Sequence, residues 1–208
     1  MANRKKNDSN EIFYICCAVG MVMFIPFIVF MILHYKKLTR HYITSTTQRV
    51  FDIRSFLKAL GVVFSITAGI SYYALSYISS ITSPYDLLCG SVYLIVLFYA
   101  MYRMSLSLSS TYFGVVINPQ TRKIIIPVDA ANCSLSELLA FNFIRKAGCV
   151  EEISLDQIDR VTKEKGVKFY IHGAFGSRMI GFSRKQKRDE CLSAIQRHTR
   201  LRSSDYGY

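Results

Sequence analysis

Three long stretches of this 208-residue chain contain almost no charged side chains. Residues 12–35 hold no Lys, Arg, Asp or Glu, and residues 59–78 and 87–108 together hold only Arg103. An apolar run of about 20 residues is long enough to cross the roughly 30 Å hydrocarbon core of a bilayer. The sequence therefore predicts transmembrane helices over these three ranges, within a transmembrane region at 12–108, and an N-terminal tail at 1–11.

The sequence also lacks the motifs of the common catalytic chemistries. It contains no G-x-S-x-G, H-E-x-x-H, Walker A or protein-kinase pattern. The H-G-A-F-G-S run at residues 172–177 resembles a phosphate loop, but no Lys follows it and strands are expected on both sides. The sequence therefore predicts a protein that is not an enzyme. An enzyme acting on a membrane substrate is the alternative that this lack argues against.

The six cysteines and four histidines form no recognisable metal or redox motif. No two cysteines have the C-x-x-C spacing, and the histidines do not cluster with them. No helix-turn-helix, zinc finger or RNA-binding motif accompanies the net charge of +12. We therefore expect no cofactor, no metal ion and no nucleic-acid partner.

Basic residues are distributed unequally between the segments that join the apolar stretches. Residues 36–58 contain six Lys or Arg, whereas residues 79–86 contain none. Loops rich in Lys and Arg stay on the cytoplasmic side of a membrane. The sequence therefore predicts a multi-pass protein of the inner (plasma) membrane with its N-terminus outside and its C-terminal half in the cytoplasm. Arg4, Lys5 and Lys6 run against this rule.

Small residues recur along one face of the second apolar stretch. Gly61, Ser65 and Gly69 lie four positions apart, a spacing that lets helix backbones approach closely in lipid. Two alternatives stay open for this helix-packing face. It could contact the other helices of the same chain, or it could mediate self-association or docking on a membrane partner.

The second half of the chain has the pattern of a small soluble domain at 109–201, followed by a flexible tail at 202–208. The expected strands, helices and turns follow one another as a hairpin at 112–117 and 123–128, a helix at 134–147, a strand at 152–161, a hairpin at 167–172 and 178–182, and a helix that Ser183 caps and that runs to about residue 200. The hydrophobic phase shifts at Ile158, which indicates a bulge or short turn. The predicted fold class is a membrane protein of α+β type: three transmembrane helices followed by a small antiparallel β domain closed by a C-terminal helix.

Three runs of this half carry a resemblance to a known family. They are EEISLDQIDRVTKEKGVKFYIHG at 151–173, RMIGFS at 178–183 and RKQKRDECLSAI at 184–195. Together they resemble the second half of a bacterial pleckstrin-homology-like (PH-like) domain, a family often joined to transmembrane helices. The resemblance implies a bent sheet closed by the last helix, and scaffolding or recruitment in place of catalysis. Residues 129–150 are longer than the usual connection in that family.

Two basic clusters are the candidate binding residues. The first cluster lies at the start of the last helix and consists of Arg184, Lys185, Lys187 and Arg188. The second surrounds an expected hairpin turn and consists of Lys163, Lys165 and Lys168. Cations at a helix N-terminus oppose the helix dipole, so another interaction could favour them there. Binding of an anionic lipid headgroup or of an acidic protein segment would stabilise cations at this position. The simpler alternative is that these residues form a solvated surface turn without a ligand.

These observations lead to two function hypotheses. The first is a non-enzymatic inner-membrane anchor or adaptor whose PH-like domain binds membrane lipids or a protein partner. The second is a subunit of a membrane transport, secretion or conjugation complex, including an exclusion protein of a conjugative plasmid.

Overall fold

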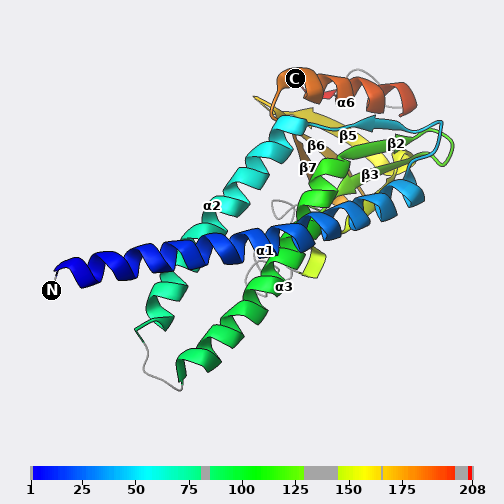
Figure 1. Cartoon of the computed structure of the whole chain (residues 1–208). Helices are drawn as coiled ribbons and strands as arrows, with labels where there is room; N and C mark the ends of the chain where they lie inside the picture. Colours follow the sequence, from blue (N-terminus) through cyan, green and yellow to red (C-terminus); the bar gives the residue numbers. More distant parts are fainter. Residues whose placement is uncertain (1, 81–84, 129–144, 165, 200–205, 208) are drawn as a thin grey trace.

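The computed structural model describes residues 2–80, 85–128, 145–164, 166–199 and 206–207. Three long helices come first in the chain, and two antiparallel sheets and a last helix follow (Figure 1). This is an α+β layout. The first helix crosses the other two, and its last turns reach the sheets (Figure 1).

The three long helices are α1 (Ala2–Tyr42), α2 (Ile53–Ile78) and α3 (Tyr85–Phe113). Each contains a segment long and apolar enough to span a membrane, so they fit a multi-pass membrane protein. Phe27 of α1, Phe56 of α2 and Met101 of α3 are buried in one cluster between them. Most other large apolar side chains of the helices face outward.

The helix boundaries differ from those predicted: α1 continues past residue 35 to Tyr42, and α2 begins at Ile53 instead of residue 59. The tail expected at 1–11 belongs to α1, which begins at Ala2, and the third helix continues beyond 108 to Phe113. At the serine-rich end of α3, side-chain hydroxyls bond to carbonyls of the preceding turn of the helix. Ser105 Oγ donates to Tyr102 O over 2.7 Å, and Ser110 Oγ donates to Ser107 O over 2.8 Å.

The first sheet has the strand order β1-β2-β3-β4 and the second has the order β7-β6-β5-β8. The strands are β1 (Gln48–Val50), β2 (Val115–Asn118), β3 (Lys123–Pro127), β4 (Val150–Ser154), β5 (Ile158–Lys163), β6 (Lys168–Gly173), β7 (Gly176–Gly181) and β8 (Tyr206–Gly207). The two predicted hairpins are confirmed as β2–β3 and β6–β7. The phase shift at Ile158 corresponds to a 3-10 turn, Leu155–Gln157, through which the chain passes from the first sheet to the second.

Strand β1 comes from a part of the chain that was predicted to be a loop between helices. It pairs antiparallel with β2, with Arg49 opposite Val116. We call the part of the chain that forms the two sheets and the last helix the sheet region. It therefore extends beyond residues 109–201, and the α2–α3 hairpin is inserted between its first two strands. The sequence gives β1 little signal because the strand has only three residues.

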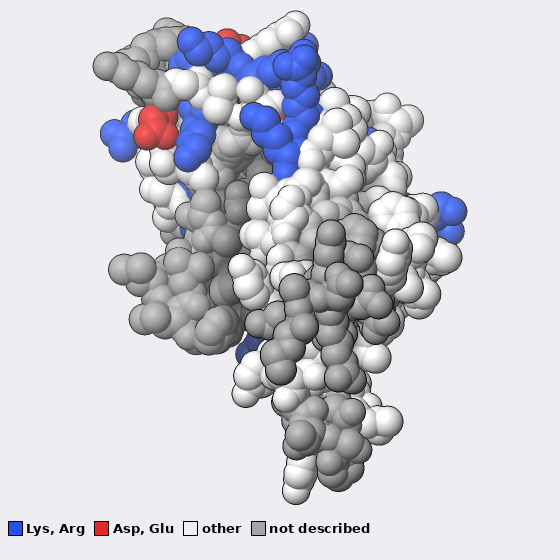
Figure 2. Space-filling model, turned by 60° about the vertical axis from the view of Figure 1, so that its left-hand side comes forward, with Lys and Arg blue, Asp and Glu red and all other residues white. Residues whose placement is uncertain are grey.

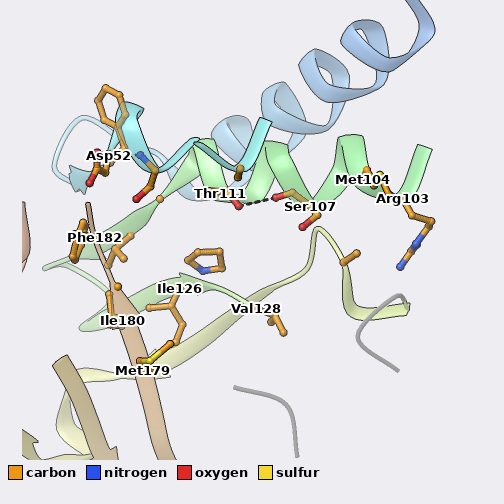
Figure 3. Close-up of a pocket in the computed structure, with 18 of the residues that line it drawn as sticks. Asp52, Arg103, Met104, Ser107, Thr111, Ile126, Val128, Met179, Ile180 and Phe182 are labelled. Carbon is orange, nitrogen blue, oxygen red and sulfur yellow. Dashed lines mark hydrogen bonds between the residues drawn. The ribbon is translucent and has the colours of Figure 1, made fainter. Parts of the chain in front are cut away.

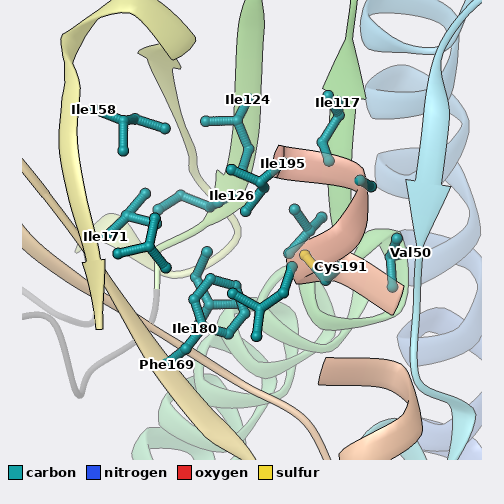
Figure 4. Close-up of a cluster of buried hydrophobic side chains, with 14 of the residues drawn as sticks. Val50, Ile117, Ile124, Ile126, Ile158, Phe169, Ile171, Ile180, Cys191 and Ile195 are labelled. Carbon is teal, nitrogen blue, oxygen red and sulfur yellow. The ribbon is translucent and has the colours of Figure 1, made fainter. Parts of the chain in front are cut away.

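The main core lies between the two sheets and the last helix, α6 (Lys185–His198). Val50, Ile124, Phe169 and Ile195 converge there from β1, β3, β6 and α6 (Figure 4). Fully burying a side chain of this kind stabilises a fold by about 1.5–3 kcal/mol. The core therefore holds β1 to the later strands through Val50.

The other face of the first sheet is also covered. Val116 and Ile125 point away from the main core and are buried with Leu38 of α1 and Phe113 of α3. Because both faces of β2 and β3 are buried, their sequences are uninterrupted apolar runs. The end of α1 thus packs against the first sheet.

Three further predictions have different outcomes. The helix expected at 134–147 falls almost entirely outside the described residues. The tail expected at 202–208 contributes β8, which pairs in parallel with β5, so that prediction is wrong at Tyr206 and Gly207. Ser183 does not cap α6: the N-cap is Arg184, which makes no side-chain capping hydrogen bond.

Candidate binding surfaces at the helix–sheet junction

Arg49 of β1 joins the sheet to two of the long helices. Its guanidinium donates to the carbonyl oxygens of Phe113 and Tyr112, over 2.9 and 2.5 Å, and to the hydroxyl of Tyr35, over 3.0 Å. It also lies over the rings of Tyr35, Phe51 and Tyr112, with 4.3 Å to the centroid of Phe51. Arg49 therefore caps the carboxyl end of α3 and fixes it to α1.

Asp52 makes a second junction, between α2 and α6. Its Oδ1 accepts from the backbone N–H groups of Arg54 and Ser55, as an N-cap of α2 should. Its Oδ2 accepts from both the backbone N–H and the hydroxyl of Ser183, each over 2.6 Å. Ser183 was predicted to cap α6 and instead joins the start of α6 to the start of α2.

The environment of Asp52 favours its charged form. Burial alone would raise the pKa of this carboxyl, but the hydrogen bonds from Ser183, Ser55 and Arg54 outweigh burial and lower the pKa below its usual value. Asp52 is therefore an anion at neutral pH and holds the two helix ends together by charge-assisted hydrogen bonds.

The four basic residues predicted as a cluster at the start of α6 have three different roles. Arg184 and Lys185 are exposed. Lys187 forms an ion pair with Glu190 at 2.8 Å. Arg188 is only 4 % exposed and donates to the carbonyl oxygen of Gly166, so it is a structural residue of the sheet region. The prediction that Arg188 is available to a ligand is wrong.

The second predicted cluster is divided as well. Lys163 lies 3.4 Å from Asp189, whereas Lys168 is exposed. Lys165 lies outside the described residues. The turn between β5 and β6 is held by Arg188 through Gly166, and Lys163 is held near α6 by Asp189. Of this cluster, only Lys168 is described as a solvent-exposed cation.

A different group of basic residues is brought together by the Asp52–Ser183 contact. Arg54 and Lys58 lie one turn apart at the start of α2, and Arg184 and Lys185 follow Ser183. All four are exposed. We call them the basic patch. Figure 2 shows Lys and Arg side chains gathered at the end of the molecule that carries α6.

Three carboxylates of β4 and the 3-10 turn that follows it form ion pairs. Glu151 of β4 forms a bidentate ion pair with Arg178 of β7, with distances of 2.8 and 2.9 Å, and thereby links the two sheets. Asp156 forms a similar pair with Arg122, and Glu152 pairs with Lys123 at 2.8 Å. These carboxylates have structural partners and do not form an acid–base pair.

The small-residue face of α2 is open. Gly61, Ser65 and Gly69 are exposed, and a Cβ atom added at either glycine would meet no atom of the described chain within 4 Å. The side chains of α2 that contact α1 and α3 are on another face and include Phe56 and Phe64. The two glycines contact no described residue of α1 or α3, so the described residues give no support to the first alternative, contact with the other helices of the same chain.

A histidine, a serine and a threonine form a network on the outer face of the second sheet. His172 Nδ1 lies 2.7 Å from Ser177 Oγ, and its Nε2 lies 2.7 Å from Thr162 Oγ1. Burial and, to a smaller extent, Arg160 lower the pKa of His172. In a catalytic triad, the histidine nitrogen that faces away from the nucleophile contacts a carboxylate. In this network Thr162 lies at that position, so no anion is described there that would stabilise a charged imidazole.

Two cysteines of the sheet region differ in accessibility. Cys191 is buried in the core, and burial raises the pKa of its thiol far above the usual value. Cys149 is exposed. Within the described residues, no group of three or more His, Cys, Asp or Glu could hold a metal ion.

A cavity of about 700 Å³ lies between α2, α3 and the sheets (Figure 3). Its walls include Ala59 and Ala100 on the helices, and Ile126 and Met179 on β3 and β7. Arg103 lines one end of this cavity, and Asp52 and Phe182 line the other (Figure 3). We call it the junction cavity. Sequence reasoning missed it because its walls come from two helices and from strands of both sheets, which are separated in the chain.

Comparisons of the chain with family models, with curated proteins and with solved structures found no match.

Proposed function

We propose that this protein is a non-enzymatic anchor or adaptor of the inner (plasma) membrane whose PH-like domain binds anionic phospholipid headgroups through the basic patch. Its three helices cross the membrane, with the N-terminus outside and the sheets on the cytoplasmic side. The two sheets with α6 against their shared core are compatible with the PH-like closure that the sequence resemblance implies.

The position of the basic patch at the start of α2 is the observation that carries this proposal. A span of α2 needs about 20 residues, and the helix has 26, so its first turn extends to the depth of the lipid headgroups. The bonds from Ser183 to Asp52 hold Arg184 and Lys185 beside that turn. Each Lys or Arg near an anionic membrane surface contributes about 1 kcal/mol of attraction.

The headgroup role predicts a lipid-dependent gain in stability that two substitutions remove. The full chain in nanodiscs should unfold at a higher temperature when phosphatidylglycerol is added to phosphatidylcholine, because a ligand of the folded state stabilises it. Replacing Arg184 and Lys185 by Gln should lower this gain by about 2 kcal/mol, or roughly 4–8 °C. The full chain is required because a fragment from residue 109 would lack β1.

A matched control removes the same charge elsewhere. Arg160 on β5 and Arg197 near the end of α6 are also exposed, and their replacement by Gln should leave the gain nearly unchanged. Equal loss in both double variants would mean that net charge alone attracts the lipid. No loss in the Arg184/Lys185 variant would overturn the headgroup role.

The orientation can be tested at Cys149, which is exposed on the sheet region. In a variant that keeps only Cys149 and has Ser at the other five cysteines, a membrane-impermeant maleimide should label the protein in inverted vesicles. Intact cells should give no labelling, because we place this thiol in the cytoplasm. Labelling in intact cells would reverse the topology.

The open face of α2 favours a second candidate function, a subunit of a membrane transport, secretion or conjugation complex. Gly61 and Gly69 offer a surface on which another transmembrane helix could pack closely. This candidate is preferred if phosphatidylglycerol stabilises the Arg184/Lys185 variant as strongly as the parent protein.

A further inference from the structure

The junction cavity is built from two kinds of wall. One wall consists of small and apolar side chains of the long helices, including Ala59 of α2 and Val96 and Ala100 of α3. The opposite wall comes from the sheets and includes Met179 and Ile180 of β7 (Figure 3). The cavity thus extends from the level of the membrane helices to the sheet region.

The two ends of the cavity differ in charge. Arg103 lines the end nearer the middle of α3, and the 16 uncharged residues before it, 87–102, extend about 24 Å as a helix, which places it close to the headgroup depth. Asp52 lines the other end, but its carboxylate already accepts hydrogen bonds from Arg54, Ser55 and Ser183. Of the charged residues described in the cavity lining, Arg103 is the cation and Asp52 the anion, so the charge of Arg103 favours an anionic group at its end.

The size and lining of the cavity determine the class of ligand. Its volume of about 700 Å³ falls within the range of roughly 300–1,000 Å³ that small-molecule sites occupy. Apolar cavities do not hold ordered water well, so a hydrocarbon chain is the better occupant. Ser107 and Thr111 are the neutral polar residues between the two ends on α3, and the Thr111 hydroxyl donates to Ser107 O over 3.0 Å.

We propose that the junction cavity holds one acyl chain of an anionic phospholipid from the surrounding bilayer, with the headgroup at Arg103. The chain runs away from the bilayer along α3 and ends against Met179, Ile180 and Phe182. This site is separate from headgroup binding by the basic patch, because none of the four patch residues is among the described residues that line the cavity.

The experiment uses the full chain in phosphatidylcholine nanodiscs that contain a small fraction of phosphatidylglycerol with a diazirine at the end of one acyl chain. Photolysis followed by mass spectrometry should place the label on Met179 or Ile180. These residues belong to a strand of the sheet region, which acyl chains of the bulk bilayer do not reach. Label confined to outward-facing residues of the long helices would overturn the proposal.

Variants of the cavity provide the second test. Ser107→Trp adds bulk to the cavity and should reduce labelling of Met179 to background, whereas Ser91→Trp, at an exposed position of the same helix, should not. Arg103→Gln should reduce labelling by about tenfold, because it removes a charge-assisted contact. Unfolding temperatures are measured for each variant, and Thr111→Phe replaces Ser107→Trp if the latter does not fold.

Three comparisons complete the design. Equal labelling by the matching phosphatidylcholine probe would overturn the role of Arg103. Labelling by a photoreactive fatty acid, without labelling by phosphatidylglycerol, would overturn the assignment to a bilayer phospholipid. In the variant with Gln at positions 184 and 185, the phosphatidylglycerol probe should label Met179 as strongly as in the parent protein. This result would separate the cavity from the basic patch. Loss of label in that variant would overturn the independence of the two sites.

Discussion

Replacing Arg49 by Ala is expected to lower the stability of the protein by about 3–5 kcal/mol, because hydrogen bonds from a charged group contribute roughly 1.5–3 kcal/mol each. The substitution removes donors to Tyr35, Tyr112 and Phe113 together with the stacking on three rings. It also leaves the last carbonyls of α3 without these partners. Thermal unfolding of the full chain in detergent should shift downward on the order of 10 °C.

Two variants make this result specific to Arg49. Arg49→Lys keeps the charge but not the planar array of donors, so its unfolding temperature should fall between those of the parent and Arg49→Ala. Arg54→Ala removes an exposed arginine five positions along the chain and should change the unfolding temperature little. If the Arg49→Ala and Arg54→Ala variants have the same unfolding temperature, Arg49 does not stabilise the junction.

Replacing Gly114 by Ala is expected to destabilise the pairing of the first two strands strongly. Gly114 has a φ of 73°, where a non-glycine residue is strained by about 1–2 kcal/mol. A Cβ atom at this position would also lie 2.6 Å from the carbonyl oxygen of Val50. Because that oxygen belongs to β1, the clash acts directly on the pairing of β1 with β2. We expect a loss of at least about 2 kcal/mol, seen as a fall of roughly 4–8 °C in unfolding temperature.

Gly61→Ala is the control for this substitution. Gly61 lies inside α2, and an added Cβ atom there meets nothing within 4 Å. Alanine is favoured over glycine inside a helix by about 1 kcal/mol, so this variant should unfold at or above the temperature of the parent. A Gly114→Ala protein as stable as Gly61→Ala would show that β1 and β2 tolerate a wider separation.

The long helices and the late hairpins could be predicted from the sequence because their signals are local. Uncharged runs identify helices, and Asn118 begins the β2–β3 turn, where its Oδ1 accepts from the N–H groups of Gln120 and Thr121. Strand β1 has only three residues and is recognisable only through its partner. The run Ile124–Ile125–Ile126 could have predicted that the first sheet is covered on both faces, because an uninterrupted apolar strand is buried on both sides.

The candidate sites were harder to predict because charge alone does not distinguish surface from structure. Helical periodicity could have separated Arg188 from its neighbours, since Arg188, Cys191, Leu192 and Ile195 follow the spacing of one buried face. The basic patch could not be found in this way. It depends on Asp52 and Ser183, which are 131 positions apart in the chain and give no local signal.

The insertion of the α2–α3 hairpin between β1 and β2 has a consequence for biosynthesis. With α2 and α3 as the membrane spans proposed above, β1 leaves the ribosome before the hairpin enters the bilayer, and β2 leaves it afterwards. If only one of the two helices crosses, the strands are on opposite sides and the first sheet cannot form. Pairing of Arg49 with Val116 therefore requires that α2 and α3 both cross the bilayer or that neither does.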